Sequence, residues 1–72
     1  MAEFKIDAKV SEYITLDALL KAQGIAQTGG HAKIMIKEGE VKVDSAVETR
    51  RGRKLFGGEV VEAGGVVVKV VK

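Results

Sequence analysis

The stretch that most constrains the fold runs from Thr28 to Leu55 and reads TGGHAKIMIKEGEVKVDSAVETRRGRKL. Its first apolar residues recur at the spacing of one face of a helix. These residues are Ala32, Met35 and Ile36. After Gly39 the spacing changes to alternation, which places Val41 and Val43 on one side of a strand and Lys42 on the other. The change of period predicts a short helix, a turn and a half-buried strand in succession.

A first helix is predicted just before this stretch, over residues 16–23. Thr15 is a suitable N-cap, and Gly24 is suited to end the helix in the left-handed conformation. Thr28 is likewise a suitable N-cap for the second helix, and Gly39 is suited to end it. Nearer the N-terminus, polar and apolar residues alternate over residues 3–6, which predicts either a short edge strand or an extended arm. The apolar residues of the first helix are Leu16, Leu19 and Leu20.

The C-terminal part of the chain is typical of short strands separated by turns. Residues 66–71 are apolar at nearly every position, so this last strand is expected either to be buried on both faces or to lie at the centre of the sheet. The other predicted elements are a turn over 44–46, a return strand from Val47, a turn at Gly57-Gly58, a strand over 59–63 and a hairpin turn at Gly64-Gly65. The order of elements predicts an α+β fold, with two short packed helices against a small, mostly antiparallel β-sheet. The predicted core comprises Leu16, Leu19, Leu20, Ala32, Met35, Ile36, Val41, Val43, Leu55, Val60 and Val68.

Composition excludes several classes of protein. A chain of 72 residues forms one domain, here 1–72, close to the size at which a single core is only just sufficient. Without cysteine and with one histidine, we expect no disulfide, no metal site and no cofactor. No Ser/His/Asp, Cys/His or paired-carboxylate arrangement is present, so we expect neither an enzyme nor a small-molecule substrate. No apolar run could span a bilayer or form a signal-peptide core, which predicts a cytoplasmic protein without a membrane partner.

Positive charge is concentrated in one segment, Glu48–Lys54, which we call the basic arm. Residues 1–40 carry five basic and six acidic residues, whereas residues 41–72 carry seven and four. Charged runs are most often solvated surface, but this one lies between turns and includes two adjacent arginines, whose planar guanidinium groups suit phosphate. We predict a phosphate-binding face. Its members are Lys33, Lys37, Lys42, Arg50, Arg51, Arg53 and Lys54.

Gly29 and Gly30 open the second helix, where glycine is a poor helix former. Two interpretations remain open: free amides that face a phosphate, or close packing against the first helix. His31 follows them, and a lone histidine without a partner motif is a weak catalytic candidate. Gly29, Gly30 and His31 are therefore additional candidates for contact with RNA. Tyr13 and Phe56 could stack on bases, although packing within the protein is the more frequent role of such residues.

The pattern A-x-x-x-I-x-x-G-x-V-x-V over Ala32–Val43, followed by RRGRKL and by G-x-V-V over Gly58–Val61, resembles the S-four RNA-binding domain. That family is named after the fourth protein of the small ribosomal subunit. The resemblance covers about residues 14–70 and leaves 1–13 as an N-terminal arm or edge strand. The RRGRKL segment is most similar to the short, free-standing bacterial members, in which the domain is the whole protein.

The resemblance implies the αL-type RNA-binding motif, in which two helices lie against a small sheet. It also implies that structured RNA, often ribosomal or transfer RNA, binds a basic face, with the ribosome as a possible partner. Residue by residue, it assigns the face to Lys33, Lys37, Lys42, Arg50, Arg51, Arg53 and Lys54. The chain departs from the family at Thr15 and Gly29, where most members carry an arginine that contacts RNA. We therefore expect the mode of RNA contact to depend on the RRGRK segment in place of these two arginines.

Two other functions remain open at the level of the sequence. The same fold and arm would suit a protein-interaction module with an acidic protein partner. A DNA-binding accessory role is a further alternative. Neither the RNA, the oligomeric state nor the pathway is specified by the sequence.

Overall fold

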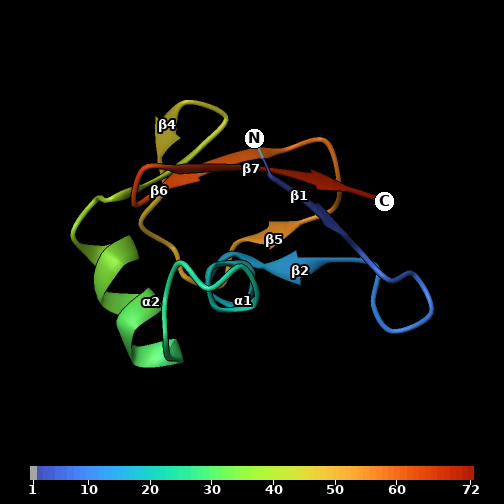
Figure 1. Cartoon of the computed structure of the whole chain (residues 1–72), viewed down its shortest axis with the longest axis horizontal. Helices are drawn as coiled ribbons and strands as arrows, with labels where there is room; N and C mark the ends of the chain where they lie inside the picture. The colour runs from blue at the N-terminus through green and yellow to red at the C-terminus, as the bar shows by residue number, and fades with distance from the viewer. Residues whose placement is uncertain (1) are drawn as a thin grey trace.

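The computed structural model describes residues 2–72, and it shows an α+β fold with one layer of helices under one sheet (Figure 1). Both predicted helices are present, and each is short. In chain order the elements are β1 (Ala2–Lys5), β2 (Ile14–Thr15), α1 (Leu16–Ala22), α2 (Gly29–Lys37), β3 (Val41–Val43), β4 (Ala46–Val47), β5 (Lys54–Leu55), β6 (Val60–Ala63) and β7 (Val66–Val71).

The main sheet has five strands in the order β1-β7-β6-β3-β4. Every neighbouring pair is antiparallel except β1 and β7, which are parallel. The N-terminal segment is thus an edge strand, one of the two forms expected for it. Two-residue turns close both hairpins, at Asp44-Ser45 and at Gly64-Gly65. Asp44 and Ser45 have positive φ values of 51° and 70°, the conformation that lets a two-residue turn follow the twist of the strands.

The core lies between the helices and the face of the sheet that is turned toward them. Buried side chains from α1, α2 and four strands form one cluster. Val60 was predicted in this core, and that prediction is wrong: Val61 is fully buried and Val60 is only half-buried. Val61 pairs with buried Val68, whereas Val60 pairs with exposed Lys69. Two adjacent valines look alike in the sequence, and only the register decides which one faces the core. Buried hydrophobic residues that the prediction lacked are Ile6, Ala26, Val61, Ala63 and Val70.

The last strand, β7, lies inside the sheet between β1 and β6 but buries only one face. Val68 and Val70 are buried, while the residues that alternate with them are open to differing degrees: Lys69 is exposed, and Val67 and Val71 are half-buried. The alternative in which both faces of this strand are buried is therefore wrong. Its run of valines reflects a strand with neighbours on both sides, because branched side chains suit a paired strand even on the open face.

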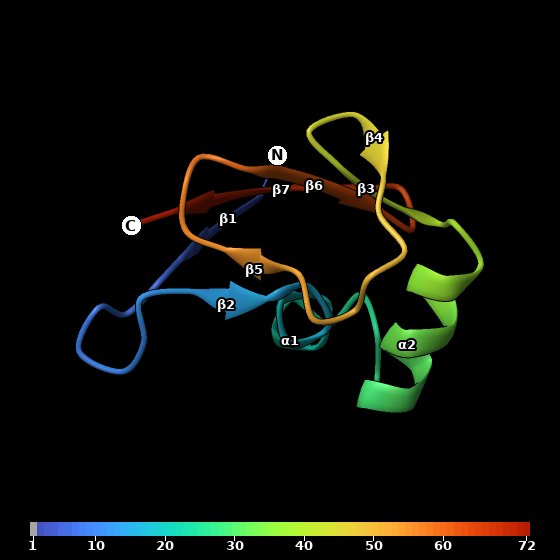
Figure 2. The same ribbon diagram turned by 180° about the vertical axis from the view of Figure 1, so that it is seen from behind.

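A second, two-stranded ribbon was not predicted. It pairs β2 with β5 in antiparallel register, so that Ile14 lies opposite Leu55 and Thr15 opposite Lys54. Figure 2 shows the chain between β4 and β5 leaving the sheet and passing along α1 before it forms β5. The ribbon lies on the helix side of the sheet in both views. It brings the basic arm against the start of α1.

Candidate nucleic-acid interface

The basic arm is attached to α1 by its backbone. The amide of Leu16 donates to the carbonyl of Arg53 at 2.9 Å, and the amide of Asp17 donates to the carbonyl of Arg51 at 3.1 Å. The first amides of a helix have no partner within the helix, so an outside acceptor must satisfy them. Thr15 stands at the N-cap position as predicted, but its side chain makes no capping bond. The arm supplies the cap instead, and α1 thereby fixes the path of the arm.

Glu48 organises the arginines of the arm. Its carboxylate accepts from the backbone amide of Arg50 at 3.1 Å, from Nε and Nη2 of Arg50 at 3.1 Å each, and from Nη1 of Arg53 at 2.9 Å. Glu48 is 7% exposed, and its own amide donates to the carbonyl of Val41 in β3. The buried carboxylate of Glu48, next to the sheet, therefore clamps the side chains of Arg50 and Arg53, which follow it by two and five residues in the sequence.

The electrostatics of this cluster follow from its hydrogen bonds. The side-chain hydrogen bonds from Arg50 lower the pKa of Glu48 from 4.5 to about 2, with a further contribution from Arg53, against the opposing effect of burial. The same hydrogen bonds raise the pKa of Arg50 above its ordinary value. Glu48 is ionised at neutral pH, so the arm carries four cations and one internal anion.

Three of the four cations of the arm line one recess. Arg50, Gly52, Arg53 and Lys54 line an open hollow of about 610 Å³. Arg51 is exposed and, among residues 2–72, forms no ion pair, although its carbonyl is bonded to α1. The arm thus combines a backbone held in place with guanidinium donors that remain available. Such an arrangement suits an anion with several oxygens, such as phosphate.

The other predicted cations lie on two further elements. Lys33 and Lys37 are exposed on α2, four residues apart and therefore on the same side of that helix. Lys42 is exposed on β3 between buried Val41 and Val43, so it points to the face of the sheet opposite the helices. Its cross-strand neighbour there is Glu62. The structure therefore brings together the cations of the arm, places a lysine pair on α2, and turns Lys42 to the other face.

The glycine pair at the start of α2 does not serve close packing. A Cβ added to Gly29 would meet nothing within 4 Å, and one added to Gly30 would meet only Oγ1 of Thr28 at 3.8 Å. The packing interpretation is therefore wrong. Thr28 caps α2 as predicted, because its Oγ1 accepts from the amide of His31 at 3.0 Å. Nδ1 of His31 in turn accepts from the amide of Gln27 at 3.2 Å, which gives this ring a local capping role.

Two features of this region have only a weak signal in the sequence. In the sequence, Glu48 is simply the first residue of the basic arm. The spacing E-x-R-x-x-R that it opens is the only signal that its carboxylate binds two arginines. Tyr13 and Phe56, far apart in the chain, lie with ring centroids 5.8 Å apart.

Within residues 2–72, no group of three or more His, Asp or Glu side chains has the arrangement of a metal site. No helix in that range is long and apolar enough to cross a membrane.

Comparison with known proteins places this fold and arm in a family. The family described as "S4 domain" matches residues 4–71. The chain belongs to the S4-domain family. A solved S4-like relative supports this assignment at the level of the fold: the solution structure of YbcJ from E. coli, described as revealing an ALFAL motif involved in RNA-binding, superposes with a TM-score of 0.75. The alignment has 43% identity and covers 100% of this chain and 89% of YbcJ.

Relatives in sequence carry related names. "Putative RNA-binding protein YbcJ" of Escherichia coli (strain K12) is 48% identical over 59 residues, which cover 82% of this chain and 84% of that protein. "Probable ribosome maturation protein RlbA" of Bacillus subtilis (strain 168) is 47% identical over 55 residues, or 76% of this chain and 78% of that protein.

Proposed function

We propose that this protein is a non-catalytic RNA-binding module that recognises structured RNA, ribosomal or transfer RNA in particular, through the basic arm. The observation that carries the proposal is the recess formed by Arg50, Gly52, Arg53 and Lys54 on a backbone bonded to α1. Membership of the S4-domain family and the names of the relatives support RNA as the partner. Because ribosomal RNA is the leading target, we propose the cytoplasm as the compartment.

The arm contributes to binding through preorganised charge. The negative charge of Glu48 neutralises one positive charge of the arm. Nη1 of Arg50 and the other donors of Arg53 are not bonded to Glu48 and remain available to a ligand. Arg51 keeps its whole guanidinium free of ion pairs within the described chain. We therefore expect Arg51 to contribute more binding free energy per side chain than Arg50. Lys33 and Lys37 extend the contact along α2, and Gly29, Gly30 and His31 lie at the start of the same helix.

Phosphate contacts release counterions, so the logarithm of the binding constant falls linearly with the logarithm of salt concentration. We expect a slope of roughly −3 to −4 for four or five contacts on a hairpin RNA. Arg51→Ala should reduce the slope by about one contact and weaken all RNAs alike, because phosphate contacts carry no base sequence. Lys69→Ala is the matched control, since Lys69 is exposed on the outer face of the sheet, away from the arm. Lys42→Ala tests whether that outer face takes part.

The experiment also separates the alternative functions. Titration of the wild-type protein with hairpin RNA and with duplex DNA of equal length, at several salt concentrations, distinguishes RNA from DNA binding. Preference for the RNA is expected, because A-form shape and the 2′-hydroxyl distinguish the two. A flat salt dependence, or binding by both Arg51→Ala and Lys54→Ala equal to that of their parent, would refute RNA binding by the arm and leave an acidic protein as the partner. Sedimentation with ribosomes, followed by crosslinking and sequencing of the RNA, would identify the target.

A further inference from the structure

The two-stranded ribbon carries aromatic side chains on its open face. Ile14 lies opposite Leu55 in the ladder, so Tyr13 and Phe56 are the next residues along the same two strands. Their ring centroids are 5.8 Å apart, and their planes meet at 54°. Leu55 is fully buried, whereas Phe56 is 47% exposed. The ribbon thus buries one side in the core and presents an aromatic pair on the other.

The aromatic pair is continuous with the basic arm. Nζ of Lys54 lies 5.0 Å from the centroid of the Tyr13 ring, within the range of a cation–π contact. Lys54 also lines the recess of the arm together with Arg50 and Arg53. One side chain therefore borders both the phosphate-binding recess and the aromatic rings. A nucleotide offers the matching chemistry, because its phosphate and its base lie on opposite sides of one sugar.

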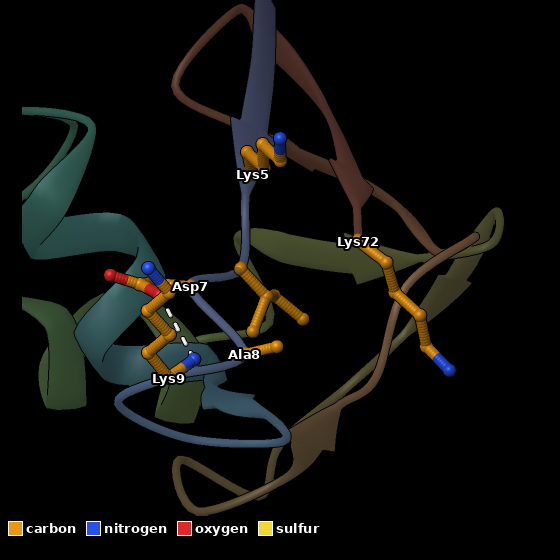
Figure 3. A pocket seen from close by; sticks show the side chains of 6 residues that line it. Lys5, Asp7, Ala8, Lys9 and Lys72 are labelled. Atoms are coloured by element: carbon orange, nitrogen blue, oxygen red, sulfur yellow. Dashed lines mark hydrogen bonds between the residues drawn. The ribbon is translucent and has the colours of Figure 1, made fainter.

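Phe56 also forms the wall of a second hollow of about 360 Å³. Its lining comprises Ile6, Ala8, Ser11, Glu12, Phe56 and Lys72. Ile6, Ala8 and Phe56 supply the apolar part of this lining, and the carboxylate of Glu12 is an acceptor suited to the N–H groups of a base. Lys72 lines both this hollow and a neighbouring one of about 480 Å³. Figure 3 shows that neighbouring hollow, with the loop around Asp7, Ala8 and Lys9 on one side and Lys72 on the other.

Phe56 is held in place before any ligand binds. Its amide donates to Oε2 of Glu59 at 2.9 Å, and the next amide, of Gly57, donates to Oε1 of Glu59 at 2.8 Å. Gly57 packs so closely on Lys72 that an added Cβ would lie 2.8 Å from Cγ of that lysine. An exposed ring on a backbone fixed in this way loses little conformational entropy on stacking, which favours binding.

We propose that Phe56, with Tyr13 beside it, is a stacking site for an unpaired nucleobase, and that Lys54 guides the phosphate of the same nucleotide toward the basic arm. This inference rests on the proposed RNA-binding function and names its substrate class: RNA with a bulged or single-stranded nucleotide next to a helix. Base-paired RNA supplies phosphates to the arm but no free base to the rings.

A hairpin RNA with a single bulged 2-aminopurine tests the inference, with the same hairpin fully paired as the reference. On binding to wild-type protein, stacking should quench the fluorescence of the bulged base, and the bulged hairpin should bind at least about fivefold more tightly than the paired one. Phe56→Leu, which keeps an apolar side chain but removes the ring, should abolish this preference without changing the salt dependence of binding. Val47→Ala is the control, since Val47 is 54% exposed on β4, an edge strand of the five-stranded sheet and no part of the ribbon.

The outcomes distinguish this inference from the proposed function. If Arg51→Ala weakens both hairpins alike while Phe56→Leu keeps the bulge preference, the stacking site is refuted and RNA binding by the arm stands. If wild-type protein binds neither hairpin, both proposals fail. Thermal melts show whether Phe56→Leu is folded. If Phe56→Leu is unfolded, the fluorescence of the bulged base bound to wild-type protein decides the question. An unquenched base in the complex would overturn the inference, and a quenched base would support it.

Discussion

Replacement of Glu48 by glutamine tests whether the clamp on the arginines stabilises the fold. Glutamine keeps the shape of the side chain and one carbonyl acceptor, but it loses the charge and places an amide N–H₂ toward guanidinium donors. Glu48 accepts four hydrogen bonds, three of them from guanidinium groups. Hydrogen bonds to charged groups contribute about 1.5–3 kcal/mol each when well shielded. The side chain of Arg50 is 76% exposed, so solvent screens much of its share.

The pKa of Glu48 expresses the effect of the same hydrogen bonds as a free energy. Its fall from 4.5 to about 2 corresponds to roughly 3 kcal/mol at 1.36 kcal/mol per pKa unit, an upper bound before screening at the exposed arginine is allowed for. We expect Glu48→Gln to lower the free energy of unfolding at pH 7 by about 1–2 kcal/mol. A domain of this size has on the order of 5 kcal/mol in total, so the loss should be easily measured.

The pH dependence follows from the sign of the shift. The unfolded carboxyl group binds a proton near its ordinary pKa of 4.5, whereas the folded one binds it only near 2. The stabilisation is therefore fully present above about pH 5 and is lost as the pH falls through 4.5 toward 2. The difference in stability between wild type and Glu48→Gln should shrink over this range and vanish near its lower end.

Urea denaturation followed by circular dichroism, at pH values from 7 to 2, measures both effects. Glu40→Gln is the matched control, because Glu40 is exposed and forms no ion pair within residues 2–72. Equal stability of Glu48→Gln and its parent at pH 7 would contradict the clamp. So would a difference that stays constant down to pH 2, because a purely steric effect does not titrate.

Four further predictions concern the core, two glycines and the arm. Leu20→Ala or Ile36→Ala, both at fully buried positions, should lower the free energy of unfolding by about 2–5 kcal/mol, and thermal melts that match the parent would refute the packing of the helices. Gly30→Ala should keep or raise stability by up to about 1 kcal/mol, because the added Cβ makes only an ordinary contact with Oγ1 of Thr28 at 3.8 Å, and a loss of RNA affinity in this variant would support contact of phosphate with the start of α2. Gly57→Ala should instead lower stability by about 1–3 kcal/mol, since φ is +120° and Lys72 is in the way; unchanged chemical denaturation would count against this. Arg51→Ala should reduce the salt dependence of hairpin binding by about one contact, whereas Lys69→Ala should leave it unchanged.

Local signals in the sequence were sufficient for most of the secondary structure. Thr15 and Thr28 mark the starts of the two helices, and Gly24 and Gly39, both with positive φ, mark their ends. These signals work because caps and turns depend on the conformational freedom and hydrogen-bonding groups of single residues. Alternation likewise predicted that Val41 and Val43 face the core. The concentration of cations between Glu48 and Lys54 is also a property of the sequence alone.

The tertiary structure decided the pairings between distant segments. Only the register of β6 against β7 distinguishes Val61 from Val60, and only the ribbon of β2 with β5 brings Phe56 beside Tyr13. The ribbon also places the carbonyls of the arm on the free amides of α1. Burial of Glu48 beside β3 then turns an apparently uniform run of charge into a clamp with two bound arginines. The strand pairings and the cap on α1 depend on which chain segments the core brings together, and no periodicity or local preference along the sequence encodes them.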